Sequence, residues 1–542
     1  MIKRIISLSV ALLLVFACSA CSPEVNTLSG DRLSLYAPPE ESVNYLMPNI
    51  DVVIGDEEGL VDVKSHGAKG DGTADDTAAV NAAIAAMGES GGILYFSHGT
   101  YVINSNVTVP ENIAFAVATS TKIKLAENAT LKVNSSDLYL PKRQNLTGKG
   151  LYDFRDGVNY AFPEWFGTGG VGIAKAITAA DTVYLSKITY NIEDKIVIPQ
   201  ERDIKIIGVS NYGTKIDSYS DVMFEYIYES GKVSTVEFSY IKVTDSAGGN
   251  FLVFNGNPET KEGTVKFNNM AFWGCGDAVI LKNCSNNLFK EIYTMGTGYL
   301  AIFEGGVNDT TFEQVLCSSN KQGLIVADGA NENTEKSQNL YFYFAASVWA
   351  YNIDYNIKNY DNVQFINSSG DLGAGETNEA SIKLENVNGF TMLRSWCASN
   401  SGISYAASAG IAKIRVGVWL VNCTDITIKG NSIQNHDIAI RIDGGSGEKP
   451  IVVEGNVIQA SGSADFVLNG AKNVTIRGNA MYSTGQHERL KYGDRTGNYN
   501  LKIGDPCKDI LFEHNITRGV LRGDDGAKKK YNGITVGENH GL

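Results

Sequence analysis

The chain has 542 residues, of which 43% are hydrophobic and 20% are charged, and its formal net charge is −14. A chain of this length can bury a sizeable core, and its acidity argues against nucleic acid and an anionic membrane surface as partners. A polyanionic substrate would be repelled overall unless a local basic patch or a bound cation intervened. Glycine accounts for 57 residues, about 11% against a usual level of about 7%, which is typical of a chain with many tight turns.

The first residues predict export from the cytoplasm. Lys3 and Arg4 precede an apolar run over residues 5–17, which is too short to span a bilayer and fits a secretory leader. With Cys18 and Cys21 after the run, residues 1–21 resemble a bacterial lipoprotein signal. The resemblance implies that Cys18 or Cys21 is lipidated and that the protein is anchored to the cell envelope, at the outer membrane in a Gram-negative cell. Simple cleavage and secretion is the alternative.

Residues 22–60 are polar and aperiodic and contain Pro38, Pro39 and Pro48, so they predict a tether. A strand is then expected at residues 61–64, followed by a glycine-rich loop and a short helix. Asp75 or Asp76 would cap this helix, and Gly88 would end it. The loop lacks the Lys-Ser/Thr pair of a phosphate-binding P-loop.

This segment carries a family resemblance. Gly67-Ala-Lys-Gly-Asp-Gly-Thr-Ala-Asp-Asp-Thr77, the alanine-rich run after it and Gly92-Ile-Leu-Tyr through Gly99-Thr-Tyr-Val-Ile103 resemble the pectate-lyase-like superfamily, in its rhamnogalacturonase, epimerase and phage-tailspike branch. The resemblance implies a right-handed parallel β-helix whose N-terminal end is closed by the short helix. It says little about chemistry, because the family includes hydrolases, lyases, epimerases and proteins that are not enzymes. The tailspike likeness also raises a homotrimer as one oligomeric state.

The motif occurs twice. Pro163-Glu-Trp-Phe-Gly167 precedes a second alanine-rich helix, and residues 182–192 then match residues 93–103 without gaps at a constant offset of 89. Residues 61–162 are therefore predicted to form a first capping unit, and a second unit is predicted to begin at residue 163.

A repeat of about 23 residues organises the rest of the chain. Its central apolar position is occupied by Phe267, Phe289, Phe312, Phe342, Phe365, Met392, Ile428, Val453, Ile476 and Phe512. Three places further on, the later repeats carry Asn431, Asn456, Asn479 and Asn515, whose stacked amides can bond to one another and to the turns. A fixed period with one strand pair per unit predicts a stacked array. The expected fold is all-β, a right-handed single-stranded parallel β-helix over residues 163–517, with residues 518–542 as a C-terminal cap or tail.

The six cysteines beyond the leader lack the spacing of metal ligands. They are expected to be buried free thiols, and Cys275 with Cys284 is the one pair worth testing as a disulfide.

The first candidate site uses the turn that precedes the second strand of each repeat. Carboxylates on adjacent coils of a parallel array can approach the separations that glycosidases need. Asp437 and Asp465 occupy this turn, in a register similar to that of the polygalacturonase aspartates, and are predicted to stack side by side as the catalytic pair. His487 and Glu488, in the insertion over residues 485–495, would assist. Substrate binding is assigned to His436, Arg441, Arg489 and Tyr492. The alternative is that each aspartate only forms its turn.

The second candidate site is the insertion over residues 368–379. It contains Asp371, Glu376 and Glu379, with Trp349 one coil before and Arg394 and Trp396 one coil after. Acidic groups beside aromatic side chains suit sugar binding. The alternative is a solvated loop with tryptophans filling corners of the coil.

These patterns favour a polysaccharide-cleaving enzyme, with hydrolysis ahead of β-elimination. A lyase would take its base from His487, Lys491 or Tyr492 and would need Ca²⁺ or another group to neutralise a uronate, but no aspartate trio marks a metal site. The polygalacturonase motif Asn-Thr-Asp is absent, no Asp-Asp doublet stands at the candidate coils, and the Asp-Pro-His of mannuronan epimerases is absent. The rival from another class is a non-catalytic β-helix that binds surface glycan.

Overall fold

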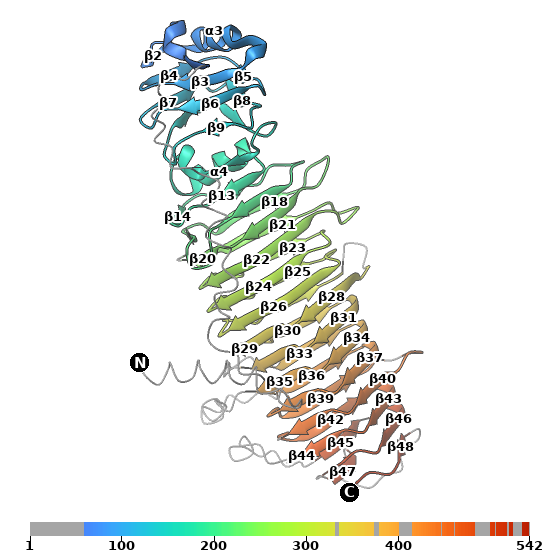
Figure 1. The fold of residues 1–542 in the computed structure, drawn as a ribbon. Coiled ribbons are helices and arrows are strands. Elements are labelled where there is room, and N and C mark those ends of the chain that lie inside the picture. The colour runs from blue at the N-terminus through green and yellow to red at the C-terminus, as the bar shows by residue number, and fades with distance from the viewer. Residues whose placement is uncertain are drawn as a thin grey trace, which may run out of the picture. The chain divides into compact units, whose positions relative to one another are not determined.

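The computed structural model describes residues 59–540, except 246, 331–334, 373–378, 400–414, 446, 460, 483–498, 505, 518–519 and 524–533. In these residues the chain winds into parallel strands, and each coil pairs with the coil above and the coil below (Figure 1). The predicted all-β parallel β-helix is confirmed. Within the described ranges, no helix is both long and apolar enough to cross a lipid bilayer.

The first coils form three small sheets. Their strands are β1 (Leu60–Asp62), β3 (Gly92–Phe96), β6 (Ile113–Val117) and β9 (Leu138–Tyr139); β2 (Asp71–Asp75), β4 (Thr100–Ile103), β7 (Lys122–Leu125) and β10 (Leu146–Gly148); and β5 (Val107–Val109), β8 (Thr130–Val133) and β11 (Leu151–Asp153). The helices of this part are η2 (Val63–His66), α3 (Thr77–Met87) and η3 (Gly88–Ser90). The predicted helix is thus present as α3, and its closing of the coil end stays a prediction.

The glycine-rich loop before α3 is held by its own carboxylates. Asp71 accepts hydrogen bonds from the backbone of Thr73 and Ala74, and these bonds lower its pKa to about 2. Asp75 accepts from the Thr77 N–H at the start of α3, whereas Asp76 accepts from the N–H groups of Lys69 and Val102. Of the two predicted caps, only Asp75 therefore bonds to the helix start. The motif's acidic residues shape the loop and its contact with β4.

The second start repeats the local structure of the first. It consists of β12 (Tyr160–Ala161), η4 (Pro163–Trp165), α4 (Gly169–Ala179), β13 (Thr182–Tyr184) and β14 (Thr189–Ile192). Tyr101 and Tyr190, which the offset of 89 relates, are both buried. The Tyr101 hydroxyl donates to Ser97 O at 3.0 Å, and the Tyr190 hydroxyl accepts from Ser186 N at 2.8 Å.

Two large sheets then run to the last coil. Besides β12, β13 and β14, the 24-stranded sheet contains β16 (Ile204–Ile207), β17 (Lys215–Ser218), β19 (Thr235–Ser239), β20 (Lys242–Asp245), β22 (Thr264–Trp273), β24 (Leu288–Met295), β26 (Thr310–Ser318), β28 (Ser337–Tyr343), β29 (Ala346–Ala350), β31 (Tyr360–Ile366), β32 (Ser369–Leu372), β34 (Asn388–Leu393), β35 (Trp396–Ser399), β37 (Thr424–Lys429), β38 (Ser432–Gln434), β40 (Ile451–Glu454), β41 (Val457–Gln459), β43 (Lys472–Arg477), β44 (Ala480–Tyr482), β46 (Lys508–Glu513) and β48 (Ile534–Val536).

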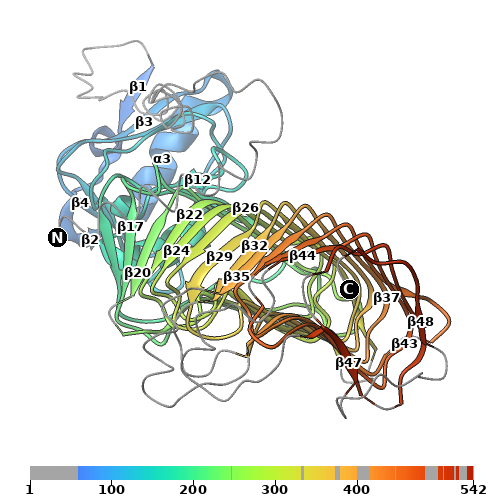
Figure 2. The same ribbon diagram turned by 90° about the horizontal axis from the view of Figure 1, so that it is seen from below.

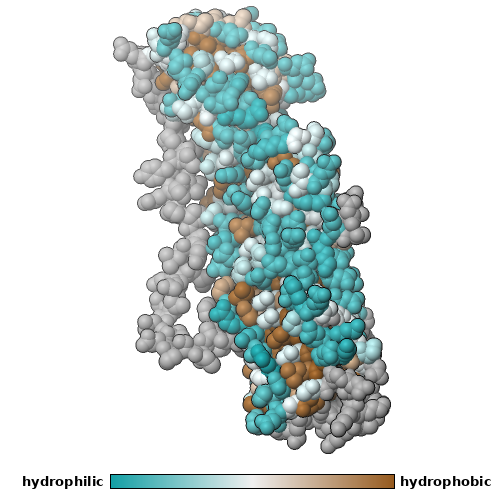
Figure 3. Space-filling view, turned by 90° about the vertical axis from the view of Figure 1, so that its right-hand side faces the viewer, coloured by the Kyte–Doolittle hydropathy of each residue, from teal (hydrophilic) through white to brown (hydrophobic). Residues whose placement is uncertain are grey.

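The 13-stranded sheet contains β15 (Ile196–Val197), β18 (Val222–Ile227), β21 (Asn250–Asn255), β23 (Val279–Lys282), β25 (Ala301–Glu304), β27 (Ile325–Asp328), β30 (Tyr355–Lys358), β33 (Ala380–Glu385), β36 (Val416–Val421), β39 (Ile438–Asp443), β42 (Ala464–Asn469), β45 (Tyr499–Gly504) and β47 (Val520–Gly523). The view in Figure 2 shows the coils of both sheets winding around a shared interior. In Figure 3, hydrophilic side chains cover most of the visible face, with apolar side chains exposed in places.

The interior contains the predicted file of aromatic rings. Phe267, Phe289 and Phe312 pair directly across neighbouring strands and are fully buried. The centroids of Phe289 and Phe312 lie 4.5 Å apart, and those of Phe312 and Phe342 lie 4.9 Å apart, with both pairs stacked. Each coil therefore buries its apolar lining against the coils beside it.

One residue per coil bends the larger sheet. This residue has a positive φ, for example 53° at Asn269, 48° at Arg394 and 64° at Gly430. The next side chain turns inward, and in the later coils it is an asparagine. Asn431, Asn456 and Asn479 each donate from Nδ2 to the Oδ1 of the following asparagine at 2.9 to 3.0 Å, and the same Oδ1 accepts a backbone N–H. The predicted asparagine ladder is confirmed and continues through Asn515 to Asn539.

The cysteines of the described coils are free thiols, and Cys275 is not bridged to Cys284. Five of the six are buried, and Cys507 is half-buried. Burial raises the pKa of Cys317 to about 12, so this thiol is protonated at neutral pH.

Candidate functional site

The long insertions of the coil leave it at one corner, between the two large sheets. Residues 373–379 connect β32 to β33, residues 400–415 connect β35 to β36, and residues 483–498 connect β44 to β45. The two coils between the second and third insertions make the same connection with only residues 435–437 and 460–463. Both candidate sites of the sequence therefore belong to the same corner of the fold.

The predicted pairing of Asp437 with Asp465 is wrong. In the ladder between β39 and β42, Ile438 lies opposite Ala464 and Ile440 opposite Phe466, which sets Asp437 opposite Ser463 and Asp465 opposite Ala439. Both carboxyl groups are fully buried. Asp437 accepts the backbone N–H of Arg415 at 2.8 Å, and Asp465 accepts the Asn500 amide at 2.7 Å. These contacts are structural, and a catalytic role for the two aspartates has no support in this geometry.

His436 and Arg415 are also internal. The His436 ring is 1% exposed, and its Nε2 lies 3.0 Å from the Ser381 hydroxyl two coils away. Arg415 is 3% exposed and donates to the Ser399 hydroxyl at 3.0 Å. Since His436 is buried and bonded to a core serine, its predicted contact with substrate is not supported.

A buried file of side chains follows this corner along the 13-stranded sheet, and we call it the corner file. From the ladder registers it consists of Met223, Phe251, Ala278, Leu300, Leu324, Asp354, Ser381, Gly417, Ala439, Asp465 and Asn500. All of these positions are buried. The first five are apolar, and polar side chains begin at Asp354. The corner file therefore changes from apolar to polar side chains at the coil that precedes the first long insertion.

Asp354 and Asp371 lie near each other at this point, and the charge of Asp371 acts on Asp354. The Ser347 hydroxyl donates to Asp354 Oδ1 at 2.5 Å. Glycine at position 370 leaves room for the other oxygen, because a Cβ there would lie 3.2 Å from Asp354 Oδ2. Asp354 Oδ2 and Asp371 Oδ1 are both buried and have no hydrogen-bond partner among the described residues.

Burial governs the protonation of this pair. It raises the pKa of Asp354 well above the ordinary value, the Ser347 hydrogen bond lowers it, and the nearby charge of Asp371 raises it further. Burial also raises the pKa of Asp371 to about 7. Burial thus favours the protonated form of Asp354, and near neutral pH Asp371 can either give or take a proton.

Asp371 differs from the other corner aspartates in where it points. Side chains alternate along a strand, so Asp371 lies on the same face of β32 as Ser369, whose ladder partner is Trp396. Asp371 retains 8% exposure, whereas Asp354, Asp437 and Asp465 have none. Asp371 is thus the corner carboxyl that a ligand on the outer face could reach.

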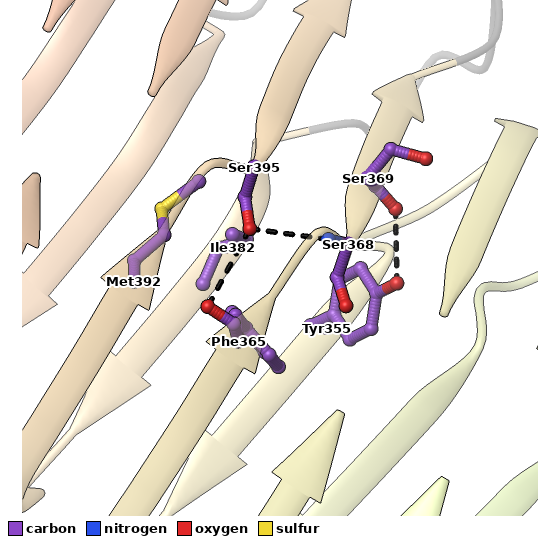
Figure 4. A pocket seen from close by; sticks show the side chains of 7 residues that line it. All are labelled: Tyr355, Phe365, Ser368, Ser369, Ile382, Met392 and Ser395. Atoms are coloured by element: carbon purple, nitrogen blue, oxygen red, sulfur yellow. Dashed lines mark hydrogen bonds between the residues drawn. The ribbon is translucent and has the colours of Figure 1, made fainter. Parts of the chain in front are cut away.

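The interior beneath this point is closed to ligands. The gap lined by Tyr355, Phe365, Ser368, Ser369, Ile382, Met392 and Ser395 has no room for a water molecule (Figure 4). The Tyr355 hydroxyl donates to Ser369 O at 2.9 Å, which ties β30 to β32. A substrate would therefore have to lie on the outer face rather than inside the coil.

The remaining residues of the second candidate site surround Asp371 only in part. Trp349 and Trp396 are half-buried, Arg394 is exposed at the bend of its coil, and Glu379 lies 3.7 Å from the Lys383 ammonium group. Glu376, like His487, Glu488, Arg489 and Tyr492 of the first candidate site, lies outside the described residues.

Arg441 belongs to a separate cluster on the outer face of the 13-stranded sheet. Its guanidinium group lies over the Trp419 ring at 4.6 Å and bonds to Asp443 at 2.7 Å. Lys383 also lies over the Trp419 ring, at 4.4 Å, and Asp443 accepts the Trp419 indole N–H. Arg441 is thus already bonded within the protein, and the sequence analysis did not anticipate Trp419 or Asp443.

Across the described residues, no group of three or more His, Cys, Asp or Glu side chains comes together as a metal site. The proximity of Asp354 to Asp371 was also not predicted from the sequence. Its signal was present, because Asp354 directly precedes β30 just as Asp437 directly precedes β39.

Together, the fold and this corner define a parallel β-helix with two neighbouring buried carboxyl groups, whose pKa values are raised, at the corner from which its long insertions leave. Residues 60–153 match the family model described as rhamnogalacturonase A/epimerase, pectate lyase-like. This match confirms the family resemblance that the glycine-rich motif indicated for this part of the chain.

Curated relatives match over short segments. A probable glucan endo-1,3-beta-glucosidase of Arthroderma benhamiae is 48% identical over 54 residues, which are 10% of this chain and 6% of the relative. The non-secreted LysM effector LysM19 of Penicillium expansum is 40% identical over 52 residues, 10% of this chain and 4% of that protein. The chain thus spans only a small part of the relatives it matches. Their names describe different roles, so the shared segment does not specify a reaction.

Among solved structures, the N-terminal fragment of bacteriophage Phi29 gene product 12 aligns over 89% of this chain and 71% of its own length. Its TM-score is 0.38 and its sequence identity is 13%, values that say nothing about the activity of this chain.

Proposed function

We propose that the protein is an exported enzyme that cleaves glycosidic bonds of a polysaccharide, with Asp371 as the general acid. The observation that carries the proposal is a carboxyl group with its pKa raised to about 7, on the outer face of the coil and on the strand that directly precedes the insertion over residues 373–379. Coils about 4.8 Å apart offer an extended substrate a long surface. The family model and the Arthroderma relative, which are both named after glycan-acting enzymes, also support a glycan substrate.

In this proposal, protonated Asp371 gives its proton to the glycosidic oxygen as the bond to the sugar carbon breaks. Water then adds to that carbon and returns a proton to the enzyme, so hydrolysis consumes one water per bond. Asp354 does not touch substrate, because it is fully buried. Its role is to position β32 behind Asp371. Glycosidases use two carboxyl groups, and the second is proposed to come from the predicted residues outside the described ranges, with Glu488 first.

β-Elimination on a uronate is the alternative chemistry. It needs a base and neutralisation of the uronate, and Ca²⁺ is the cation to test. Incubation of the protein with a panel of bacterial, algal and plant polysaccharides separates the alternatives. New reducing ends without ultraviolet absorbance indicate hydrolysis, new absorbance from a double bond indicates elimination, and retention of glycan without either indicates binding only.

The decisive variant is Asp371→Asn, which keeps the shape of the side chain and removes the proton donor. Turnover is expected to fall by roughly 10²- to 10⁴-fold. In the unmodified enzyme, activity is expected to fall as pH rises through about 7, because the acid form of Asp371 is then lost. Asp509→Asn is the control, since Asp509 is exposed on β46. If Asp371→Asn and Asp509→Asn have the same turnover, Asp371 is not the acid.

Export and anchoring are part of the same proposal. If Cys18 or Cys21 is lipidated, replacing both by serine should release the protein from the membrane fraction. Fractionation of cells that express each single and double variant would identify the modified cysteine.

A further inference from the structure

A second cluster of chemically active side chains lies on the outer face of earlier coils, on strands β17, β20, β22 and β24. Two neighbouring files form it. The first contains Lys215, Lys242, Ala271 and Tyr293, and the second contains Asp217, Thr244, Trp273 and Met295. We call these side chains the lysine–tryptophan cluster. None of them belongs to the candidate sites at the corner.

The two lysines of the cluster lie in an unfavourable arrangement. Lys215 and Lys242 are directly opposite each other on adjacent strands, and like charges in this position are destabilising. Lys215 bonds to Asp217 at 3.0 Å. Lys242 has no acidic partner among the described residues, and its ammonium group lies 3.3 Å from the centroid of the Trp273 ring. An anionic ligand would supply the charge that Lys242 lacks.

Aromatic and polar groups surround this lysine. Trp273 and Tyr293 contact edge to face at 6.4 Å, and Tyr212 near them is 81% exposed. The indole Nε1 of Trp273 and Oδ1 of Asp217 are buried and have no hydrogen-bond partner among the described residues. An amine, aromatic rings and unpaired polar atoms together fit a sugar unit that carries a negative charge.

The cluster is aligned with Asp371. From Trp273 the same file passes through Met295, Ser318 and Val348 to Asp371. Four steps between strands correspond to about 19 Å. A polysaccharide lying across the coils would therefore contact both places at once.

We infer that the lysine–tryptophan cluster binds an anionic sugar unit, a uronate or a sulfated sugar, of the polysaccharide that is cleaved at Asp371. The inference rests on the proposed function for the role of Asp371 but not for binding itself. It also resolves a difficulty of charge, because a protein with a net charge of −14 needs a local basic group to hold a polyanion.

The test is binding of polygalacturonate, alginate, dextran sulfate and neutral dextran to the full chain, measured by affinity electrophoresis at low and high salt. Lys242→Met removes the charge and keeps the apolar stem. It is expected to weaken binding of at least one anionic polymer about ten-fold at low salt, the worth of one charge-assisted hydrogen bond. Neutral dextran should be unaffected by the substitution. Lys266→Met is the matched control, because Lys266 is exposed on β22, the strand that pairs with the β20 strand of Lys242.

Equal weakening by Lys242→Met and Lys266→Met would overturn the inference, because it would show only an effect of net charge. Binding of neutral dextran with the same sensitivity to Lys242→Met would overturn it as well, and so would the absence of binding to all three anionic polymers. Asp371→Asn separates the two proposals. Binding that depends on Lys242 without any turnover would leave the binding site in place and remove the proposed enzyme function. Turnover that is lost in Asp371→Asn but unchanged in Lys242→Met would keep the proposed enzyme function and remove the proposed binding site.

Discussion

Asp354 shows at the scale of one residue how burial couples protonation to stability. Its carboxyl group is fully buried, and its pKa is raised well above the ordinary 3.8. Between these two pKa values the folded protein binds more protons than the unfolded chain does. The free energy of unfolding therefore falls as pH rises through this interval. The penalty is absent at low pH and largest once the folded-state carboxyl would ionise.

The first stability prediction follows from this linkage. Asp354→Asn has no charge to bury, so it is expected to raise the melting temperature at pH 8 and to change it little at pH 4. Asp203→Asn should act in the opposite direction at pH 8. Burial alone would raise the pKa of Asp203, but hydrogen bonds from Thr235 and Lys232 hold it below the ordinary value. Thermal unfolding of both variants at the two pH values checks the pair, and a lower melting temperature for Asp354→Asn at pH 8 would contradict it.

The sequence located the corner residues but not their partners. Asp437, Asp465 and Asp371 were all identified as candidates, and all three lie at the corner between the two sheets. Their register could not be read from spacing, because the connections at this corner differ in length from coil to coil. Asp437 ends a connection of residues 435–437, whereas Asp465 already lies inside β42. A shift of two residues was enough to separate the predicted pair.

At the scale of the element, the asparagine ladder joins neighbouring coils. Asn456 donates to Ile428 O and to Asn479 Oδ1, and its own Oδ1 accepts from the backbone and side chain of Asn431. Each residue thus bonds to both adjacent coils while the backbone turns. Asparagine fits because its short amide has both a donor and an acceptor.

Replacing Asn456 by alanine is expected to lower the free energy of unfolding by about 3 kcal/mol, because it leaves buried partners on both sides without hydrogen bonds. Asn191→Ala, on an exposed position of β14, is expected to change it by less than about 0.5 kcal/mol. Urea unfolding of both variants measures the difference. Similar values for the two substitutions would mean that the ladder adds no stability.

The elements themselves were largely predictable. The period of about 23 residues located the interior phenylalanines and the asparagines, because each occupies a fixed position in the repeat and pairs with the same position of the next coil. The bend inside the larger sheet was harder to predict from the sequence. β22 runs continuously from Thr264 to Trp273 through Asn269 at φ 53°, and the non-glycine residues that adopt this φ share no single type. They include Phe344 and Arg394, which sequence patterns assign to ordinary strand positions.

At the scale of the whole molecule, fold and chemistry are separable. The match to the family model ends at residue 153, before the coils that carry Asp371 and the lysine–tryptophan cluster. The stacked coils supply a uniform scaffold. The candidate functional residues are the side chains that depart from its regular pattern. Asp354 is the first polar side chain of the corner file, and Lys242 lies opposite another lysine.

The last prediction tests the stacked architecture. Phe312 lies between Phe289 and Phe342, with ring centroids at 4.5 and 4.9 Å, whereas Phe512 lies near the end of the file and pairs with Ile476 and Val536. Phe312→Ala removes a ring packed on both sides and is expected to lower the free energy of unfolding by about 4 kcal/mol. Phe512→Ala should lower it less, because the coils beyond it are few and can unfold alone. Urea unfolding followed by tryptophan fluorescence compares them. An equal or larger loss for Phe512→Ala would mean that the coils do not depend on their neighbours as the stacked rings imply.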